Sequence, residues 1–513
     1  MTRNRLAILA VLAMLVAVIP AVSVSAAETT LEEDIETSIV AGLAWLAEQQ
    51  QSDGSFGYSE KVAHTGLAVL KFEDRAIDLG FDPLDPDYAY SPVVQAGLNY
   101  IVANSLTQVI GVQPAGDPDG NGDGIGAYWS YGYHQVYNTG IAMMALAASG
   151  HPETYGDLLQ NAVDWMSWAQ IDEAYGVHRG GWRYVPNQSS SDNSTSGYAT
   201  LGLGYAAAPP PLGFGLTIPQ WVLDEHTLWI DQIQDAVNGD TFDGGSHYTP
   251  GGGWVNILKT GNLLYEMGLV GDTADAVRVQ DAVDYIERHW GDPIDIGWLN
   301  HRQAMFTMMK GLEALGIQEL DLDGGGVADD NWFEQVAQHL VATQETDGSW
   351  PQDYWGDKIL STSWALLTLE RAVPVFEIPV PFDVHPTSCR NPFNVDGKGV
   401  LPVAILGTED FDVTQIDPVT VMVEGIAPLR WALEDVATPF EPYQGKVDAF
   451  DCTTEGFDGF MDLTLKFKHA EVAEALPEVE DGEVLLLHLT GNLLEEFGGT
   501  PIVGEDVIVI IKK

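Results

Sequence analysis

The sequence predicts a closed, two-layered ring of helix pairs, followed by a domain built of β-strands. Segments with helical spacing of apolar residues recur as six pairs before residue 373. In each pair an amphipathic segment precedes an almost wholly apolar one, and a helix that is apolar on all sides has to be buried. Beyond residue 382 the apolar residues alternate with polar ones, which is typical of strands.

The repeats are marked by two short patterns. Gln-x-x-Asp-Gly-Ser-aromatic occurs at residues 50–56 and again at 344–350. Asp-Gly-Ser suits a tight turn, because glycine adopts positive φ and the Asp and Ser side chains bind nearby backbone N–H groups. The apolar helices begin with a small polar residue and a glycine or a looser equivalent: Thr65-Gly66, Thr139-Gly140, Ser196-Gly197, Thr260-Gly261, Gln303-Ala304 and Thr362-Ser363. We therefore expect the six apolar helices inside and the six amphipathic helices, such as 33–50 and 92–104, outside.

The turn pattern before a buried helix resembles the QW-type repeat of squalene-hopene cyclases and the related repeats of prenyltransferase β-subunits. The stretch 180–186, Gly-Gly-Trp-Arg-Tyr-Val-Pro, is similar to a pattern of secreted proteins in that superfamily. The resemblance covers about residues 33–372 and implies an (α/α)6 toroid.

The resemblance implies several activities, and the residues of this chain support some of these activities better than others. Cyclases use a D-x-D-D acid, of which residues 191–195 hold only Asp192. Prenyltransferases bind zinc through a Cys thiolate, and thioester domains also need Cys, but the ring segment has none. We expect neither zinc nor a nucleotide cofactor. Toroid polysaccharide lyases take a proton next to a uronate carboxylate, which Arg, Lys or calcium neutralises. Three alternatives stay open: a terpenoid-cyclase-like ligand-binding protein, a non-catalytic extracellular binding or scaffold protein, and a calcium-assisted lyase acting on acidic polysaccharide.

The charge of the chain limits the classes of partner that the protein is expected to bind. The chain has 513 residues, of which 22 are Lys or Arg and 75 are Asp or Glu, for a formal net charge of −53. Nucleic acids and anionic membrane surfaces bind through basic patches, so the sequence predicts neither as a partner.

The sequence divides into four segments. Residues 1–27 are predicted to be a secretory signal peptide, since Arg3 and Arg5 precede a short apolar run and small residues follow it. The ring is expected over 28–373, a Pro-rich linker over 374–381 and a β-sandwich over 382–513. This last segment resembles a module common in secreted bacterial and archaeal proteins. We expect a secreted protein, extracellular or at the cell surface, with no transmembrane segment in the mature chain. The sequence does not determine the oligomeric state.

Cys389 and Cys452 are the only cysteines in the chain. Both fall in the β-rich segment of a chain that is expected to be exported. The sequence therefore predicts a disulfide between them.

A ligand pocket is predicted at one mouth of the ring. Each repeat carries aromatic side chains and the scarce basic ones in the loop that leads to its inner helix. These loops meet at one end of a ring, where apolar area with a few polar groups suits a lipid-like or glycan ligand. The candidate residues are His64, Tyr133, His134, Trp182, Arg183, Tyr184, Asp192, Trp254, Trp298, His301, Arg302 and Asp357. The alternative is that the aromatics seal the repeat junctions and that the arginines bridge to loop carboxylates. The sequence assigns no catalytic residue.

Calcium is the one cofactor that the sequence suggests. Asp117, Asp119, Asn121 and Asp123 alternate with glycine and proline, and this spacing matches the first half of an EF-hand loop. Counted from Asp117, the twelfth position holds Tyr128 in place of the usual Glu. A plain Asp/Gly turn is the alternative. A second acidic loop, 321–330, is a weaker candidate.

Overall fold

The structure is a computed structural model. It describes residues 30–512 except 131, 375–377, 396, 409–410, 441–442, 444–445, 447, 477–478 and 495–500. The predicted signal peptide and part of the predicted linker therefore lie outside the described residues.

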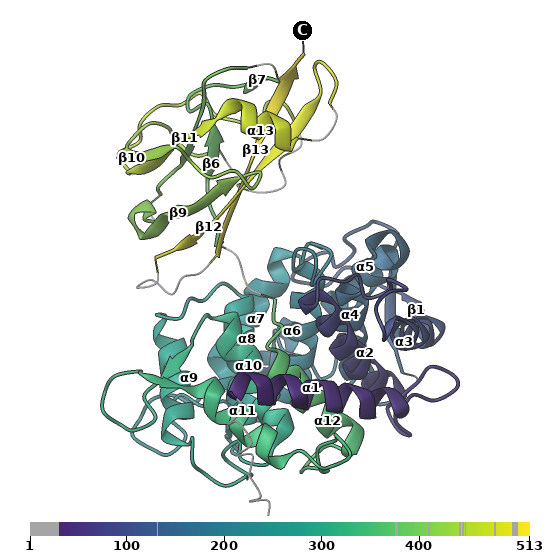
Figure 1. The fold of residues 1–513 in the computed structure, drawn as a ribbon. Helices are drawn as coiled ribbons and strands as arrows, with labels where there is room; N and C mark the ends of the chain where they lie inside the picture. Colours follow the sequence, from purple (N-terminus) through teal and green to yellow (C-terminus); the bar gives the residue numbers. More distant parts are fainter. Residues whose placement is uncertain are drawn as a thin grey trace, which may run out of the picture.

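Helices α1 to α12 form a closed double ring (Figure 1). The inner layer consists of α2 (Lys61–Asp78), α4 (Gln135–Ala148), α6 (Asn193–Ala207), α8 (Ile257–Leu269), α10 (Arg302–Ala314) and α12 (Lys358–Glu370). The outer layer consists of α1 (Leu31–Glu48), α3 (Ser91–Ala103), α5 (Pro152–Ala169), α7 (Gln220–Ile233), α9 (Val277–Arg288) and α11 (Trp332–Thr343). Each inner helix packs against the next, and α12 packs against α2. The predicted helical toroid is thereby confirmed.

The Gln of the turn motif ties each turn to the following outer helix. Gln50 Nε2 donates to the carbonyls of Gly54 at 3.1 Å and Val93 of α3 at 2.9 Å. Gln344 joins its own turn to α1 in the same way, which closes the outer layer. Gln170 and Gln234, which the sequence pattern did not reveal, make equivalent bonds to α7 and α9. The motif is a structural junction, and its chemistry is that of a turn.

The small polar residue at the start of an inner helix has a specific partner. Thr65 Oγ1 accepts from Phe56 N at 2.9 Å, and Thr139 Oγ1 accepts from Trp129 N at 3.1 Å. The following glycine allows contact between inner helices, since a Cβ at Gly140 would collide with the carbonyl of Tyr198. The inner helices are almost fully buried, yet no helix in the described part of the chain is long and apolar enough to cross a membrane.

Two hairpins in the ring were not predicted. They are β1 (Ser105–Val109) with β2 (Ile125–Trp129), and β3 (Glu319–Leu320) with β4 (Asp330–Asn331). A short 3-10 helix, η1 (Glu173–His178), lies in the third repeat.

The C-terminal part is β-rich, as predicted, and its strands form two sheets around one core. One sheet has the order β10 (Arg430–Glu434), β11 (Asp462–Lys468), β8 (Val400–Ile405), β6 (Phe382–Val384). The other has the order β5 (Ile378–Pro379), β13 (Pro501–Ile511), β12 (Val484–Leu493), β9 (Ile416–Val423), with β7 (Pro392–Asn394) also on β13. Helix α13 (His469–Ala475) and the 3-10 helix η2 (Val413–Gln415) complete it.

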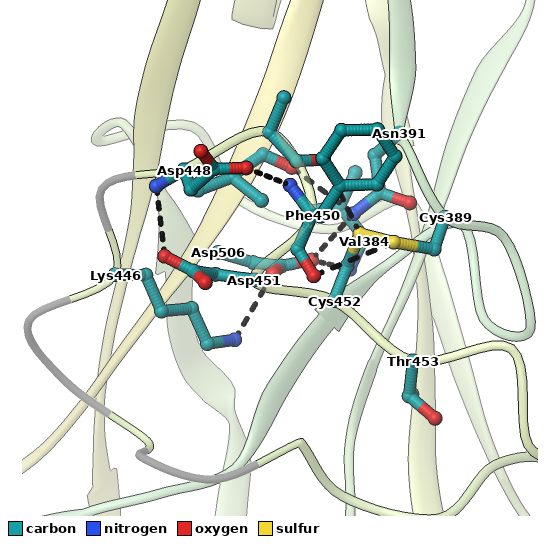
Figure 2. Close-up of a disulfide and its surroundings, with 12 residues drawn as sticks. Val384, Cys389, Asn391, Lys446, Asp448, Phe450, Asp451, Cys452, Thr453 and Asp506 are labelled. Atoms are coloured by element: carbon teal, nitrogen blue, oxygen red, sulfur yellow. Dashed lines mark hydrogen bonds and ion pairs between the residues drawn. A yellow bond between two sulfur atoms is a disulfide. The ribbon is translucent and has the colours of Figure 1, made fainter.

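The predicted disulfide is present (Figure 2). Cys389 and Cys452 have Cα atoms 5.4 Å apart. Close to them, the buried Asp506 pairs with Lys446 Nζ at 3.0 Å and accepts from Asn391 Nδ2 at 2.8 Å. The disulfide thus ties two loops of the β-rich part near a buried, hydrogen-bonded ion pair.

Candidate functional site

A cleft of about 450 Å³ opens at the N-terminal ends of the inner helices. Each inner helix contributes to its wall through the residues in or just before its first turns. The described lining residues are Glu60, His134, Tyr137, Tyr184, Ser194, Thr195, Tyr198, Tyr248, Trp254, Asn256, Leu258, Lys259, Gln303, Trp355, Leu360 and Trp364. Of the residues predicted from the sequence, His134, Tyr184 and Trp254 line the cleft.

Aromatic side chains form much of the rim. Trp254 and Trp355 are 44% and 55% exposed, and their ring centroids lie 6.1 Å apart. Tyr248 packs against Trp254 at 5.6 Å. Trp254 has a φ of 75°, a backbone conformation that is uncommon for a bulky residue and that sets its ring at the rim. Exposed aromatic faces beside polar groups offer stacking surfaces for a ring-shaped ligand.

Lys259 provides a buried positive charge in the wall. Its Nζ donates to Asn256 Oδ1 at 2.7 Å and lies 4.0 Å from the centroid of the Trp254 ring. No carboxylate among the described residues lies within ion-pair distance of this ammonium. Burial lowers the pKa of Lys259 to about 7. An anionic group bound in the cleft would therefore complete a charge pair that the protein alone lacks.

Glu60 and His134 form a hydrogen-bonded pair on the opposite side of the lining. His134 Nδ1 lies 2.8 Å from Glu60 Oε1, and Asn138 Nδ2 donates to Glu60 Oε2 at 2.7 Å. With the proton on Nδ1, an assignment that follows from this bond, Nε2 keeps a free lone pair. Glu60 has a φ of 43° where α2 begins, a strained conformation for a residue with a side chain.

Arg183 stands behind two tyrosines of the wall. It pairs with the fully buried Asp192 at 2.8 Å and lies 5.0 Å from the ring of Tyr184. The hydroxyls of Tyr184 and Tyr248 are 2.9 Å apart. Burial raises the pKa of both tyrosines, which keeps them protonated and able to donate. Tyr133 packs on Tyr184 at 4.7 Å.

The other predicted residues lie around or away from the cleft. His64 Nε2 is 3.1 Å from the carboxylate of Asp357, which caps α12. His301 and Arg302 are buried near Asp353, whose carboxylate accepts from Arg302 N at 2.7 Å. Burial lowers the pKa of His301 to about 4, so this His is neutral.

Trp182 and Trp298 do not line the cleft. Trp182 is fully buried, and its Nε1 donates to the Met166 carbonyl at the end of α5. Trp298 packs in the core against Trp290 and His339. Both close repeat junctions, which is the alternative that the sequence left open for any single aromatic.

Sequence reasoning missed the two charged residues Glu60 and Lys259 of the lining. The signal for Lys259 is its place directly before Thr260-Gly261, at the start of a largely apolar helix. A charge at such a position has to find a partner or a cleft. Glu60 precedes an inner helix without any distinguishing pattern.

The acidic groups that could bind a metal lie outside the cleft lining. Asp235, Asp240 and Asp243 are the one group whose oxygens gather within 4.8 Å of one another in the described residues. Asp243 accepts there from the backbone N–H of residues 238, 239 and 240, so its position is that of a turn cap. The loop with Asp117, Asp119, Asn121 and Asp123 contacts α5 and α7.

Comparisons with known proteins add little to this geometry. No protein-family model and no curated protein sequence matches the chain. Among solved structures, an inactive variant of the α-1,6-mannanase GH76A of Salegentibacter sp. HEL1_6, in complex with α-1,6-mannotriose, is similar at 12% identity and a TM-score of 0.45, covering 67% of this chain and 98% of its own. A GH76 α-mannanase of Bacteroides thetaiotaomicron is similar at 11% identity and a TM-score of 0.44, with the same coverages. Hormoconis resinae glucoamylase is similar at 10% identity and a TM-score of 0.35, covering 94% and 96%. Similarity at this level identifies no activity.

Proposed function

We propose that the cleft binds an acidic glycan, and that the protein cleaves it by elimination next to a sugar carboxylate. The observation that carries the proposal is Lys259, a buried ammonium that faces the cleft without an anionic partner among the described residues. A uronate carboxylate would supply that partner, while Trp254 and Trp355 stack on the sugar rings.

The cleft also holds the groups that elimination requires. His134, oriented by Glu60, is the candidate base, and the Tyr184–Tyr248 pair is the candidate proton donor. His134 Nε2 takes the proton from the carbon that bears the carboxylate, and the bond from the next carbon to the glycosidic oxygen breaks. A carbon–carbon double bond forms, and the departing oxygen takes its proton from Tyr248. Lys259 stabilises the negative charge that develops on the carboxylate.

A terpenoid-cyclase activity has less support. Protonation of an alkene needs a strong carboxylic acid inside the apolar pocket, and Asp192 is buried behind Arg183 and outside the lining. The resemblance to squalene-hopene cyclases is thus proposed to extend to the ring only. Secretion would place the cleft in contact with extracellular glycans.

A non-catalytic binding protein is the second candidate. Among the described lining residues Glu60 is the only carboxylate, and both of its oxygens are engaged by His134 and Asn138. A hydrolase would need two working carboxylates flanking the bond, so this observation favours either elimination or binding alone.

The test is to incubate the full chain with polygalacturonate, alginate and a neutral mannan. Elimination predicts new unsaturated sugar ends, seen as ultraviolet absorbance, from an acidic glycan only. His134→Gln should lower turnover about 100-fold or more. His151→Gln is the matched control, because His151 also pairs with carboxylates but lies on the outer layer.

The outcomes separate the candidates. New reducing ends without unsaturated sugars would indicate hydrolysis and would contradict elimination. Saturable binding of an acidic glycan without any product would favour the binding protein. If no glycan binds, or if the mannan binds as well as the polyuronates, the acidic-glycan proposal fails.

A further inference from the structure

Gln160, Asn161 and Asp164 on the outer helix α5 face the acidic loop that joins β1 and β2. Asp164 Oδ1 accepts from Gly120 N at 3.1 Å, and Asn161 Oδ1 accepts from Asn121 Nδ2 at 2.6 Å. A Cβ at Gly120 would lie 2.8 Å from Gln160 Nε2 and 3.1 Å from Asp164 Oδ1, so the loop approaches these two side chains of α5 closely. The loop and the helix thus form one site from two separate parts of the chain.

Asp164 is a second, independent observation that points to a ligand at this site. The residue is fully buried, and its Oδ2 has no hydrogen-bond partner among the described residues. The carboxylates of Asp119 and Asp123 lie near enough to Asp164 to interact with it electrostatically. A buried carboxylate oxygen that has no hydrogen-bond partner and lies near other carboxylates is unfavourable unless a cation binds there.

The loop has the internal hydrogen bonds of a calcium-binding loop. Both carboxylate oxygens of Asp119 accept, from Gly122 N at 2.9 Å and Gly124 N at 2.8 Å. Asn121 accepts from Asp123 N at 3.0 Å, and Asp123 accepts from Ile125 N at 2.7 Å. In this pattern Asp119 corresponds to the first position of an EF-hand-type calcium-binding loop. Asp117 instead caps the turn, because it accepts from Asp119 N at 3.2 Å.

We propose that Asp119, Asn121, Asp123 and Asp164 bind one calcium ion. Asp164 of α5 takes the place of the acidic residue that an EF-hand loop carries at its twelfth position. Hard oxygen ligands of this number and charge suit calcium, which accepts an irregular set of six to eight oxygens, whereas magnesium demands a near-octahedral one. None of these residues lines the cleft, so the ion would hold the β1–β2 hairpin on α5 and take no part in chemistry at the mouth.

The experiment is a calcium titration of the chelator-stripped full chain at about 0.15 M salt, where weak binding to the acidic surface is screened. Calorimetry should show one saturable site with a dissociation constant on the order of 10⁻⁵–10⁻³ M. Terbium should bind in its place, with luminescence excited through Trp165, the neighbour of Asp164. Calcium should displace terbium at concentrations at which magnesium does not.

Asp164→Asn and Asp123→Asn should each weaken calcium binding at least tenfold. Asp321→Asn and Asp240→Asn are the matched controls, since each removes one charge from another acidic loop, and they should change affinity less than twofold. Asp123 is exposed, so its variant decides the matter if Asp164→Asn fails to fold. The proposal would be overturned if no saturable calcium site is found, or if all four variants lose calcium affinity equally. It would also be overturned if magnesium displaces terbium at the same concentrations as calcium.

Discussion

The two ends of the ring both hold buried charges, but among the described residues the charges line a cleft at one end, the mouth, and are in contact with other protein groups at the second end, here called the closed end. At the mouth, Lys259 and Glu60 lie in the wall of the cleft, where a ligand can reach them. At the other end, the C-terminal halves of the inner helices bring Lys71 against Glu370 and Lys310 against Tyr205, with no lining residue of the cleft among them. A buried charge alone therefore does not mark a functional site. Lys259 and Lys310 both donate to neutral groups of the protein, but only Lys259 lines the cleft, where an anionic ligand can reach it.

The closed end also holds carboxylates that are buried without hydrogen bonds. They are Glu73, Asp74 and Glu266. Burial raises the pKa of all three, that of Asp74 to about 6. Protonation removes most of the cost of burying them, since a neutral acid loses far less hydration than a carboxylate.

The largest effect is expected from Glu370→Ala at the closed end. Removing the partner of Lys71 leaves a buried ammonium unpaired, which should lower the free energy of unfolding by about 3–5 kcal/mol. Chemical denaturation measures this change in the free energy of unfolding. The control is Glu345→Ala, an exposed partner of Lys358, which should cost below about 1 kcal/mol. Equal effects of the two variants would remove the distinction between the closed end and the surface.

Lys259→Met at the mouth should have opposite effects on binding and on stability. Loss of the ammonium should weaken acidic-glycan binding by about 1.5–3 kcal/mol, tenfold or more. The free energy of unfolding should rise by about 1 kcal/mol or more, because the variant no longer buries a charge at position 259. Lys310→Met is the matched control and should destabilise, since Lys310 donates to Tyr205 and to the Ala372 carbonyl. A destabilised Lys259→Met would make Lys259 structural.

The stability gap between Lys259→Met and wild type should depend on pH. The pKa of Lys259 is about 7 in the folded chain and 10.5 ordinarily. Below pH 7 the wild type bears the full cost of the buried ammonium. Between 7 and about 10.5 the unfolded chain binds one more proton than the folded chain, so wild-type stability rises relative to the variant, by at most about 1.4 kcal/mol per pH unit. Denaturation at pH 6, 7, 8 and 9 checks this, and a constant gap would refute the shifted pKa.

The smallest effect is expected at a repeat junction, between the two ends. Thr139→Val keeps the shape of the side chain but leaves Trp129 N without its acceptor, which should cost about 1–2 kcal/mol. Thr154→Val, exposed on α5, should change stability by below about 0.5 kcal/mol. If Thr139→Val is neutral, the recurring Thr/Ser does not hold the loops on the inner helices.

Local rules were sufficient to predict the ring, the β-rich part and the disulfide. Apolar spacing identified α2 and α12 as buried, because side chains three and four apart share one face of a helix. The Asp-Gly-Ser turn could be predicted because its hydrogen bonds join residues close in sequence. The pairing of Cys389 with Cys452 needed no geometry, since no other cysteine exists.

The composition of the site was decided only by tertiary structure. Lys259 and His134 are 125 residues apart in sequence, and closure of the ring brings them to the same cleft. Trp182 and Trp254 look alike in the sequence, yet one fills the core and the other stands at the rim, because burial depends on which helices surround each loop. Asp164 carries no local pattern at all, and only the packing of α5 on the β1–β2 hairpin sets it against the acidic loop. Periodicity determines which side chains face inward, whereas their partners depend on contacts between segments distant in the chain.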